Sequence, residues 1–158
     1  MTALGNVQIC CFGNPLHGDD AVGLHVYQGL QASGKFSSDQ LHFFADVPLN
    51  ALSVFEKETP VILIDALKNA GELGSVHSLS LDEICEPQDA LCSHMNSIPH
   101  LIQSAQCLYG PLKNVRMWGV CSGGIDVYSH ELSAPVSAGV KELIKTLSQR
   151  YALESVNA

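Results

Sequence analysis

Two short runs of strand-forming residues decide most of what this chain can fold into. Residues 7–12 (VQICCF) lead into the turn-forming residues 13–15 (GNP). Residues 61–64 (VILI) form the second run, which ends at Asp65. Apolar runs without regular polar alternation are typical of strands buried on both faces, as in a parallel sheet. The chain is therefore predicted to contain a sheet that helices cover on both sides.

Segments with helical periodicity separate the strand-like runs. Apolar residues recur at four-residue steps from Val22 to Leu30, which predicts a helix over about residues 20–32. A final amphipathic helix is predicted from a serine cap at Ser133 and an apolar stripe over residues 136–147. The remaining predicted elements are strands at residues 41–45, 75–81 and 115–120, and a short helix at residues 49–58.

This alternation defines the predicted fold class. Strands that alternate with helices of about 10–15 residues form parallel βαβ units with right-handed crossovers. We therefore expect an α/β fold, a three-layer α/β/α sandwich with a mostly parallel, twisted sheet of about five strands. No repeat or linker divides the 158 residues, so residues 1–158 are predicted to form a single domain. Ligands of such sheets bind at the carboxyl ends of the strands.

The charge balance narrows the classes of partner. Sixteen acidic against eight basic residues give a formal net charge of -8, which repels nucleic acid and anionic lipid surfaces. A basic protein segment or a cation suits this surface better. No apolar run approaches the roughly 20 residues that span a bilayer, and no leader segment is recognised. We expect a cytoplasmic protein without membrane insertion, and a monomer.

The six cysteines do not indicate a metal site or a catalytic thiol. They form no CxxC pair and no zinc-finger spacing, so reduced cysteines are expected. Cys10, Cys11 and Cys121 lie in strand-like runs, where cysteine usually acts as a small buried hydrophobe.

Two adjacent aspartates form the first candidate site. Asp19 and Asp20 stand in residues 13–23 (GNPLHGDDAVG), whose glycines follow no nucleotide-binding pattern and whose paired carboxylates would repel phosphate. A structural interpretation makes Asp19 the helix N-cap and Asp20 a first-turn residue favoured by the helix dipole. That interpretation accounts for one aspartate, whereas two at the carboxyl end of a strand also fit a functional site.

Asp65 is the second candidate, because it closes the apolar run of a predicted central strand. Taken alone, an aspartate there is typical of a turn or a cap. The βα loops of a doubly wound sheet meet at one edge, however. Asp20 and Asp65 can therefore converge, although 45 positions separate them.

A histidine would complete a partial ligand set, because two carboxylates and an imidazole suit a divalent transition metal. Three of the seven histidines fall on predicted helices or strands and are interpreted as ordinary surface or core residues: His25, His42 and His77. His17 lies in the acidic loop and could support a ligand. His94 and His100 are the stronger candidates, in or just after residues 82–98, which are predicted to form a long loop over the sheet.

These motifs resemble those of the hydrogenase maturation endopeptidases, which remove a C-terminal extension from the large subunit of nickel-iron hydrogenases. Residues 13–23 are similar to the family's opening signature, with Asp20 at its metal-contacting acidic position. Residues 64–66 (IDA) resemble its second acidic site, which follows a buried strand. The resemblance covers most of the chain.

The resemblance also distinguishes between the two candidate histidines. Ser93 and His94, followed by residues 101–102 (LI), are similar to the family's histidine segment, which favours His94 over His100. The last strand and the start of the C-terminal helix are similar as well, at residues 119–120 and 132–136.

Two regions depart from the family pattern. Around residues 45–48 (ADVP) the family usually has a glycine-rich DGGT-like loop. After residues 119–120 it tends to place a proline, where this chain has residues 121–124 (CSGG). Both regions are expected to contact the substrate, so they affect the identity of the partner hydrogenase more than the reaction.

The resemblance implies that Asp20, Asp65 and His94 are the catalytic residues and metal ligands. They would meet a nickel ion that the cysteine thiolates of the hydrogenase precursor already hold. Three ligands leave an open position at which a metal can polarise a carbonyl or activate water. Nickel is thus expected to arrive with the substrate rather than to be held tightly by the free enzyme, and the reaction is hydrolysis of one peptide bond.

Two other functions remain open from the residues alone. The same ligands would serve a nickel-binding chaperone or checkpoint protein that recognises the loaded precursor without cutting it. A carboxylate metallohydrolase that acts on a small molecule would instead bind its own metal tightly and need no protein partner. For a peptidase, nickel either catalyses the reaction or positions the peptide while a carboxylate acts as general base.

Overall fold

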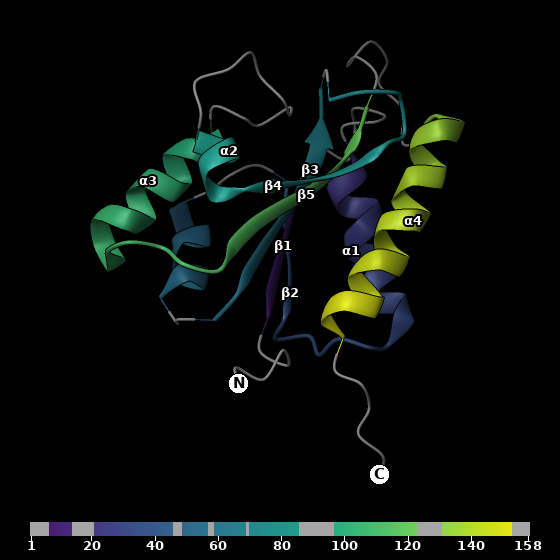
Figure 1. Ribbon diagram of the computed structural model, residues 1–158. Coiled ribbons are helices and arrows are strands. Elements are labelled where there is room, and N and C mark those ends of the chain that lie inside the picture. Colours follow the sequence, from purple (N-terminus) through teal and green to yellow (C-terminus); the bar gives the residue numbers. More distant parts are fainter. Residues whose placement is uncertain are drawn as a thin grey trace.

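Five strands form one sheet, and helices pack on both of its faces (Figure 1). The computed structural model describes residues 7–13, 21–45, 49–56, 59–68, 70–85, 97–122 and 131–152. The elements along the chain are β1 (Gln8–Phe12), α1 (Val22–Ser33), β2 (Leu41–Phe44), the 3-10 helix η3 (Leu49–Phe55), β3 (Val61–Leu67), β4 (Val76–Ser80), α2 (Leu81–Cys85), α3 (Ser97–Tyr109), β5 (Val115–Cys121) and α4 (Ala134–Tyr151).

The strand order is β2-β1-β3-β5-β4, so β3 occupies the centre of the sheet. All neighbouring strands are parallel apart from β4 and β5, which pair antiparallel. β3 pairs with β5 along all seven of its residues, whereas its ladder with β1 ends at the pair Cys11 and Ile64. β3 therefore extends past the β1 ladder by residues 65–67.

Alternate residues of β3 face two separate cores, and all seven are buried. One core lies under α1 and α4 and includes Ile62, Ile64 and Ala66. The other lies under η3, α2 and α3 and includes Val61, Leu63 and Leu67. Because the side chains of a strand alternate, Asp65 faces the layer of η3, α2 and α3. These two helical layers and the sheet between them confirm the predicted three-layer α/β/α fold.

The predicted strands are present with small shifts of their ends. β4 lies at the edge of the sheet and all its residues are half-buried, as the alternation of polar and apolar residues predicts. The predicted short helix over residues 49–58 is the 3-10 helix η3, which buries Phe55. No helix in the described parts of the chain is long and apolar enough to cross a membrane.

The start of the first helix differs from the prediction. α1 begins at Val22, its N-cap position is Ala21, and its first turn contains no acidic residue. α1 therefore starts two residues later than predicted, and Asp19 and Asp20, interpreted as N-cap and first-turn residue, lie outside the described residues. The predicted stop is confirmed, because Gly34 ends the helix in the left-handed conformation with φ of 68°.

The long loop predicted over residues 82–98 is interrupted at both ends by helix. Leu81–Cys85 form α2, which is held by the complete burial of Ile84, and α3 begins at Ser97. A helix of five residues is too short to show periodicity in the sequence. The remaining part of this segment, with His94, lies outside the described residues.

α4 begins where predicted, and Ser133 occupies the predicted N-cap position. Ser133 is the N-cap residue and its side chain makes no capping hydrogen bond; its carbonyl accepts from the Ser137 N–H instead (2.8 Å). The helix then packs closely on the chain before β4. A Cβ atom on Gly139 would lie 2.2 Å from the carbonyl oxygen of Gly74. α4 is thus fixed to the sheet by backbone contact as well as by its apolar stripe.

Candidate active site

The strand order reverses at β1, which marks where a ligand site is expected. The chain leaves β1 through α1 to reach β2 on one side, and then returns through η3 to β3 on the other side of β1. α1 contributes to one helical layer and η3 to the other. In open α/β sheets, such a reversal creates a ligand-binding crevice at the carboxyl ends of the strands. The candidate site is therefore at the ends of β1 and β3.

Asp65 lies at this point, one residue beyond the last pair between β3 and β1. Its side chain is completely buried, and its Oδ1 accepts a hydrogen bond from the Ala66 N–H at 2.7 Å. The prediction that the strand ends at Asp65 is wrong, because β5 continues to pair with β3 as far as Leu67. With respect to β1, however, Asp65 does follow the end of the ladder.

The hydrogen bond to Ala66 follows from the different lengths of the two ladders. Along a strand, the backbone N–H and C=O groups of successive residues point to opposite sides. The Pro60 carbonyl accepts from the Gln8 N–H of β1, so the backbone groups of the even-numbered residues from 60 onward point toward β1. The Ala66 N–H points the same way, where the β1 ladder has ended. The Asp65 carboxylate takes the place of the missing strand partner, as buried backbone donors require. Its orientation is thereby fixed.

Two glycines bring backbone close to this site. A Cβ atom on Gly23 would lie 2.0 Å from the Phe12 carbonyl oxygen, so the first turn of α1 can pack on the end of β1 only without a side chain there. Gly119 pairs with Asp65 from β5, and its Cβ atom would lie 2.5 Å from the Asp65 carbonyl oxygen. Sequence reasoning did not identify Gly119 as part of the site, although a glycine inside a strand indicates a close approach.

The cysteines near the site are buried thiols, as predicted. Burial raises the pKa of Cys10 to about 12. Burial also raises the pKa of Cys11 well above its usual range, and the neighbouring Cys10 and the Asp65 carboxylate add to that effect. Cys121 is 3% exposed and donates its Sγ–H to the Gly71 carbonyl. Cys10 and Cys11 therefore stay protonated near neutral pH and are unsuited to act as nucleophiles or metal ligands.

Two histidines in strands have structural partners, in agreement with their interpretation as ordinary residues. His42 Nε2 lies 2.6 Å from Gln8 Oε1, and burial lowers the pKa of this histidine, an effect that Asp39 partly offsets. His77 Nε2 lies 2.8 Å from the Ser75 hydroxyl. His100, the weaker of the two candidate histidines, is an exposed residue of α3.

Of the three predicted ligands, the structure places Asp65; Asp20 and His94 lie outside the described residues, as do His17 and Asp19. Within the described ranges, no group of three His, Cys, Asp or Glu side chains could hold a metal ion. The flanking residues of the Asp20 segment, Gly13 and Ala21, are buried. The flanking helices of the His94 segment, α2 and α3, lie in the layer that Asp65 faces.

One departure from the family pattern is built into the backbone at the end of β5. The Cys121 N–H donates to the Ser75 carbonyl at 2.8 Å, and the Ser122 N–H donates to the Leu67 carbonyl at 2.7 Å. A proline at either position could not donate. The second departure, around residues 45–48, falls largely outside the described residues.

The chain is similar to known proteins of one family. The profile of the hydrogenase maturation protease family HycI matches residues 46–150, which is more than half of the chain and includes Asp65 and His94 but not Asp20. None of the curated proteins matches.

Three solved structures illustrate the shared fold. The [NiFe] hydrogenase maturation protease HybD from Thermococcus kodakarensis is 23% identical, with a TM-score of 0.75 over 92% of this chain and 99% of that chain. The endopeptidase HycI from Escherichia coli is 17% identical, with a TM-score of 0.67 over 97% and 99%. The hydrogenase maturating endopeptidase HybD from E. coli is 14% identical, with a TM-score of 0.70 over 91% and 90%.

The structural matches show the fold, and the family profile goes further. With more than half of its residues matched by that profile, this chain belongs to the hydrogenase maturation proteases, a family of peptidases.

Proposed function

We propose that this chain is the endopeptidase that removes the C-terminal extension of a nickel-loaded nickel-iron hydrogenase large-subunit precursor, acting in the cytoplasm. One observation carries the proposal: a completely buried carboxylate, Asp65, is held at the strand-order reversal of a member of this protease family. Asp65 is the charged residue of a strand whose other residues are all apolar. Buried titratable groups in the crevice of a sheet are typical of functional sites, which favours a functional role over a structural one.

Asp20 and His94 are the proposed partners of Asp65, and the described residues around them support this. The Asp20 segment leaves β1 after Gly13 and enters α1 at Ala21, and Gly23 holds the start of α1 against the end of β1. The His94 segment connects α2 to α3 on the side of the sheet that Asp65 faces. The Asp20 segment thus starts at the carboxyl edge of the sheet, where Asp65 lies. The His94 segment starts and ends in the helical layer that Asp65 faces.

Nickel enters this scheme as part of the substrate. Two carboxylates and one imidazole form a weak cage, whereas the precursor's cysteine thiolates are softer and stronger nickel ligands. An unloaded precursor would leave the two carboxylates without a cation between them, and they would repel each other. Recognition would therefore depend on metal loading, and the enzyme would cleave only those precursors that have received nickel.

The decisive experiment supplies purified precursor with and without nickel and follows the mass of the large subunit. Wild-type enzyme is expected to shorten the loaded precursor by its C-terminal extension and to leave the unloaded precursor intact. A checkpoint protein would bind the loaded precursor without shortening it, which would overturn the proposal.

Calorimetry of nickel binding to the enzyme alone tests whether the precursor must supply part of the nickel ligands. Binding weaker than micromolar is expected, since a tight protein cage needs more or softer ligands. Submicromolar binding, or rapid cleavage of unloaded precursor, would instead favour a metalloprotease that carries its own metal.

A further inference from the structure

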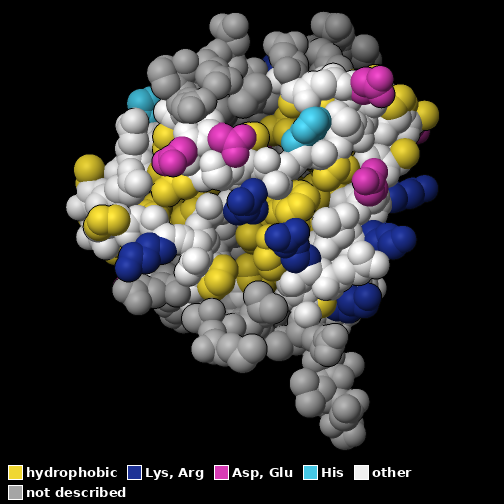
Figure 2. Space-filling model, viewed as in Figure 1, with side chains coloured by type: hydrophobic (Ala, Val, Ile, Leu, Met, Phe, Trp, Pro, Cys, Tyr) yellow, Lys and Arg dark blue, Asp and Glu magenta, His cyan; other side chains and the backbone are white. Residues whose placement is uncertain are grey.

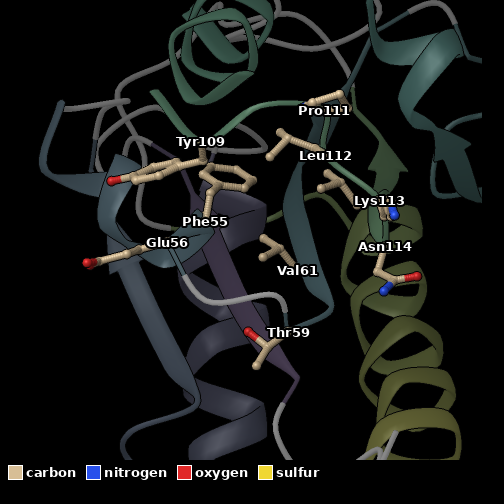
Figure 3. Close-up of a pocket in the computed structure, with 10 residues that line it drawn as sticks. Phe55, Glu56, Thr59, Val61, Tyr109, Pro111, Leu112, Lys113 and Asn114 are labelled. Atoms are coloured by element: carbon tan, nitrogen blue, oxygen red, sulfur yellow. The ribbon is translucent and has the colours of Figure 1, made fainter. Parts of the chain in front are cut away.

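A pocket of about 350 Å³ lies at the amino-terminal edge of the sheet, at the opposite end of β3 from Asp65. We call it the α3-end pocket, because the last residue of α3 lines it together with η3, the start of β3 and the segment that leads into β5 (Figure 3). Its walls are mainly apolar and come from Phe55, Val61, Tyr109, Pro111 and Leu112. Its volume is at the lower end of the range for ligand pockets.

The apolar stripe of α3 continues past the part that the protein covers. Ile98, Leu101, Ile102 and Ala105 are buried against the sheet. Leu108 and Tyr109 follow at the same three- and four-residue steps, yet they are 63% and 41% exposed. Among the described residues, only Leu73 is another large apolar side chain with such exposure.

Exposed apolar side chains beside a pocket are typical of protein interaction sites. In the space-filling view, apolar side chains are visible at the left of the molecule, on the side where Figure 1 shows α3 (Figure 2). The end of α3 is therefore an apolar helix surface without a partner in the described parts of the chain.

The two sides of the pocket carry opposite charges. Figure 3 shows Glu56 at the η3 side and Lys113 at the side of the segment before β5. Both side chains belong to exposed residues. α3 has no basic residue in its last turn, so the partial negative charge of its carboxyl end adds to that of Glu56. A segment bound in the pocket would therefore face a negative charge on one side and a positive charge on the other.

We propose that the α3-end pocket is a second contact site for the hydrogenase precursor, and this rests on the function proposed above. The pocket receives an apolar side chain of the precursor, with a basic residue of the precursor toward Glu56 and an acidic one toward Lys113. Glu56 and Lys113 are the charges that such a segment would face. The apolar side chain acts as the central anchor, as in most protein interfaces.

The size of a folded precursor allows both contacts at once. Val61 lines the pocket and lies four residues before Asp65 on β3, a distance of about 13 Å at the rise of a strand. About four to five residues of an extended chain span that distance, so a precursor bound at Asp65 can also reach the pocket. A small ligand, by contrast, would leave Leu108 and Tyr109 uncovered.

The test compares two variants that place a carboxylate on the exposed surface of α3. Leu108→Glu puts the charge on the exposed apolar end of α3, next in sequence to the pocket residue Tyr109. Gln103→Glu puts the same charge at an exposed position one and a half turns earlier. For nickel-loaded precursor, Leu108→Glu is expected to raise KM by about tenfold with kcat unchanged, which is the loss of an interface anchor. Gln103→Glu is expected to leave both constants unchanged, and equal melting temperatures would show that both variants fold.

A second arm tests the charges and keeps the net charge of the chain constant. The double variant Glu56→Lys/Lys113→Glu exchanges the two charges and is expected to raise KM by about threefold or more, with a smaller effect at high salt. An unchanged KM in both Leu108→Glu and the double variant would overturn the contact site. So would a wild-type dimer that Leu108→Glu dissociates, because the pocket would then hold a second copy of this chain.

The two proposals fail in different ways. If the chain were not the processing enzyme, wild-type protein would leave the loaded precursor uncut. If only the contact site were wrong, wild-type protein and Leu108→Glu would cut the precursor with the same KM.

Discussion

The two ends of β3 differ in what they bury. At the carboxyl end, the ladder with β1 stops one residue before Asp65, and a carboxylate is completely buried where a strand partner would otherwise lie. At the amino end, the start of the strand lines an apolar pocket, and the neighbouring side chains of Leu108 and Tyr109 are exposed.

Under the proposed function, this difference separates two requirements of a protease that acts on a folded protein. Chemistry needs a charged group that is held in one orientation and kept from water, and the backbone around Asp65 supplies that. Recognition needs apolar surface that a partner can cover, and the end of α3 supplies that. Changes at the carboxyl end should therefore lower kcat, and changes at the amino end should raise KM.

The largest effect is expected from Asp65→Asn and, in the same assay, from Asp20→Asn. Each should lower kcat for processing by roughly 100-fold or more, because it removes a charged oxygen ligand. Substitution of residues that only support a metal ligand already lowers activity by about 10- to 100-fold. The amide introduced by Asp65→Asn keeps an oxygen that can accept from the Ala66 N–H, so the free energy of unfolding should change by about 1 kcal/mol or less. Near-normal cleavage by either variant would remove that residue from the site.

A comparable loss is expected from His94→Ala, with His100→Ala as the matched control. His100 is exposed on α3, whereas His94 stands in the segment between the two helices of the layer that Asp65 faces. Cleavage rates of the loaded precursor would show which histidine matters. Loss of activity in His100→Ala alone would mean that the family motif was aligned six positions too early.

The close packing at the carboxyl end can be tested by two substitutions in α1. In Gly23→Ala the new Cβ atom would lie 2.0 Å from the Phe12 carbonyl oxygen, and backbone must move. In Gly29→Ala it would lie 2.2 Å from Cδ1 of Ile144, the flexible tip of a side chain. Denaturant unfolding should show a loss of about 2–3 kcal/mol for Gly23→Ala and of no more than about 1 kcal/mol for Gly29→Ala. Equal losses would contradict this account of the end of β1.

The smallest effect concerns the amino end. Thr59 lines the α3-end pocket, and its buried Oγ1 has no hydrogen-bond partner among the described residues. Thr59→Val keeps the shape and removes an unpaired hydroxyl, so the free energy of unfolding should rise by about 1 kcal/mol. A lower melting temperature would show that the hydroxyl is paired in solution.

Much of the sheet could be predicted from the sequence, because residues 7–12 and 61–64 are continuous strand-forming runs. The carboxyl end of β3 could not, since an aspartate interrupts the apolar run while β5 continues to pair beside it. α2 was not predicted either, because five residues show no period and the burial of Ile84 depends on tertiary packing. Local patterns thus define the interior of an element better than its ends.

The sequence placed Asp65 on the correct edge of the sheet but held no sign of the α3-end pocket. Asp65 follows an apolar run, and that order of residues is visible without the fold. The pocket is assembled from separate parts of the chain, and each of its residues is ordinary in its own context. Leu108 and Tyr109 even continue the apolar stripe of a helix, so a pattern alone predicts that they are buried.

The side of the sheet on which Asp65 lies depends on whether its position along β3 is odd or even. Odd positions of β3 face η3, α2 and α3, and even positions face α1 and α4. Inserting one residue between Val61 and Asp65 would turn the carboxylate toward α1 and α4, although its chemistry and its neighbours in sequence would be the same. Inserting two would return it to the original face, displaced by about 7 Å. An insertion before Asp65 therefore keeps the carboxylate on its face only if it comes as a pair of residues or if a β-bulge absorbs the extra one, whereas the surface loops of the same protein are free of that restriction.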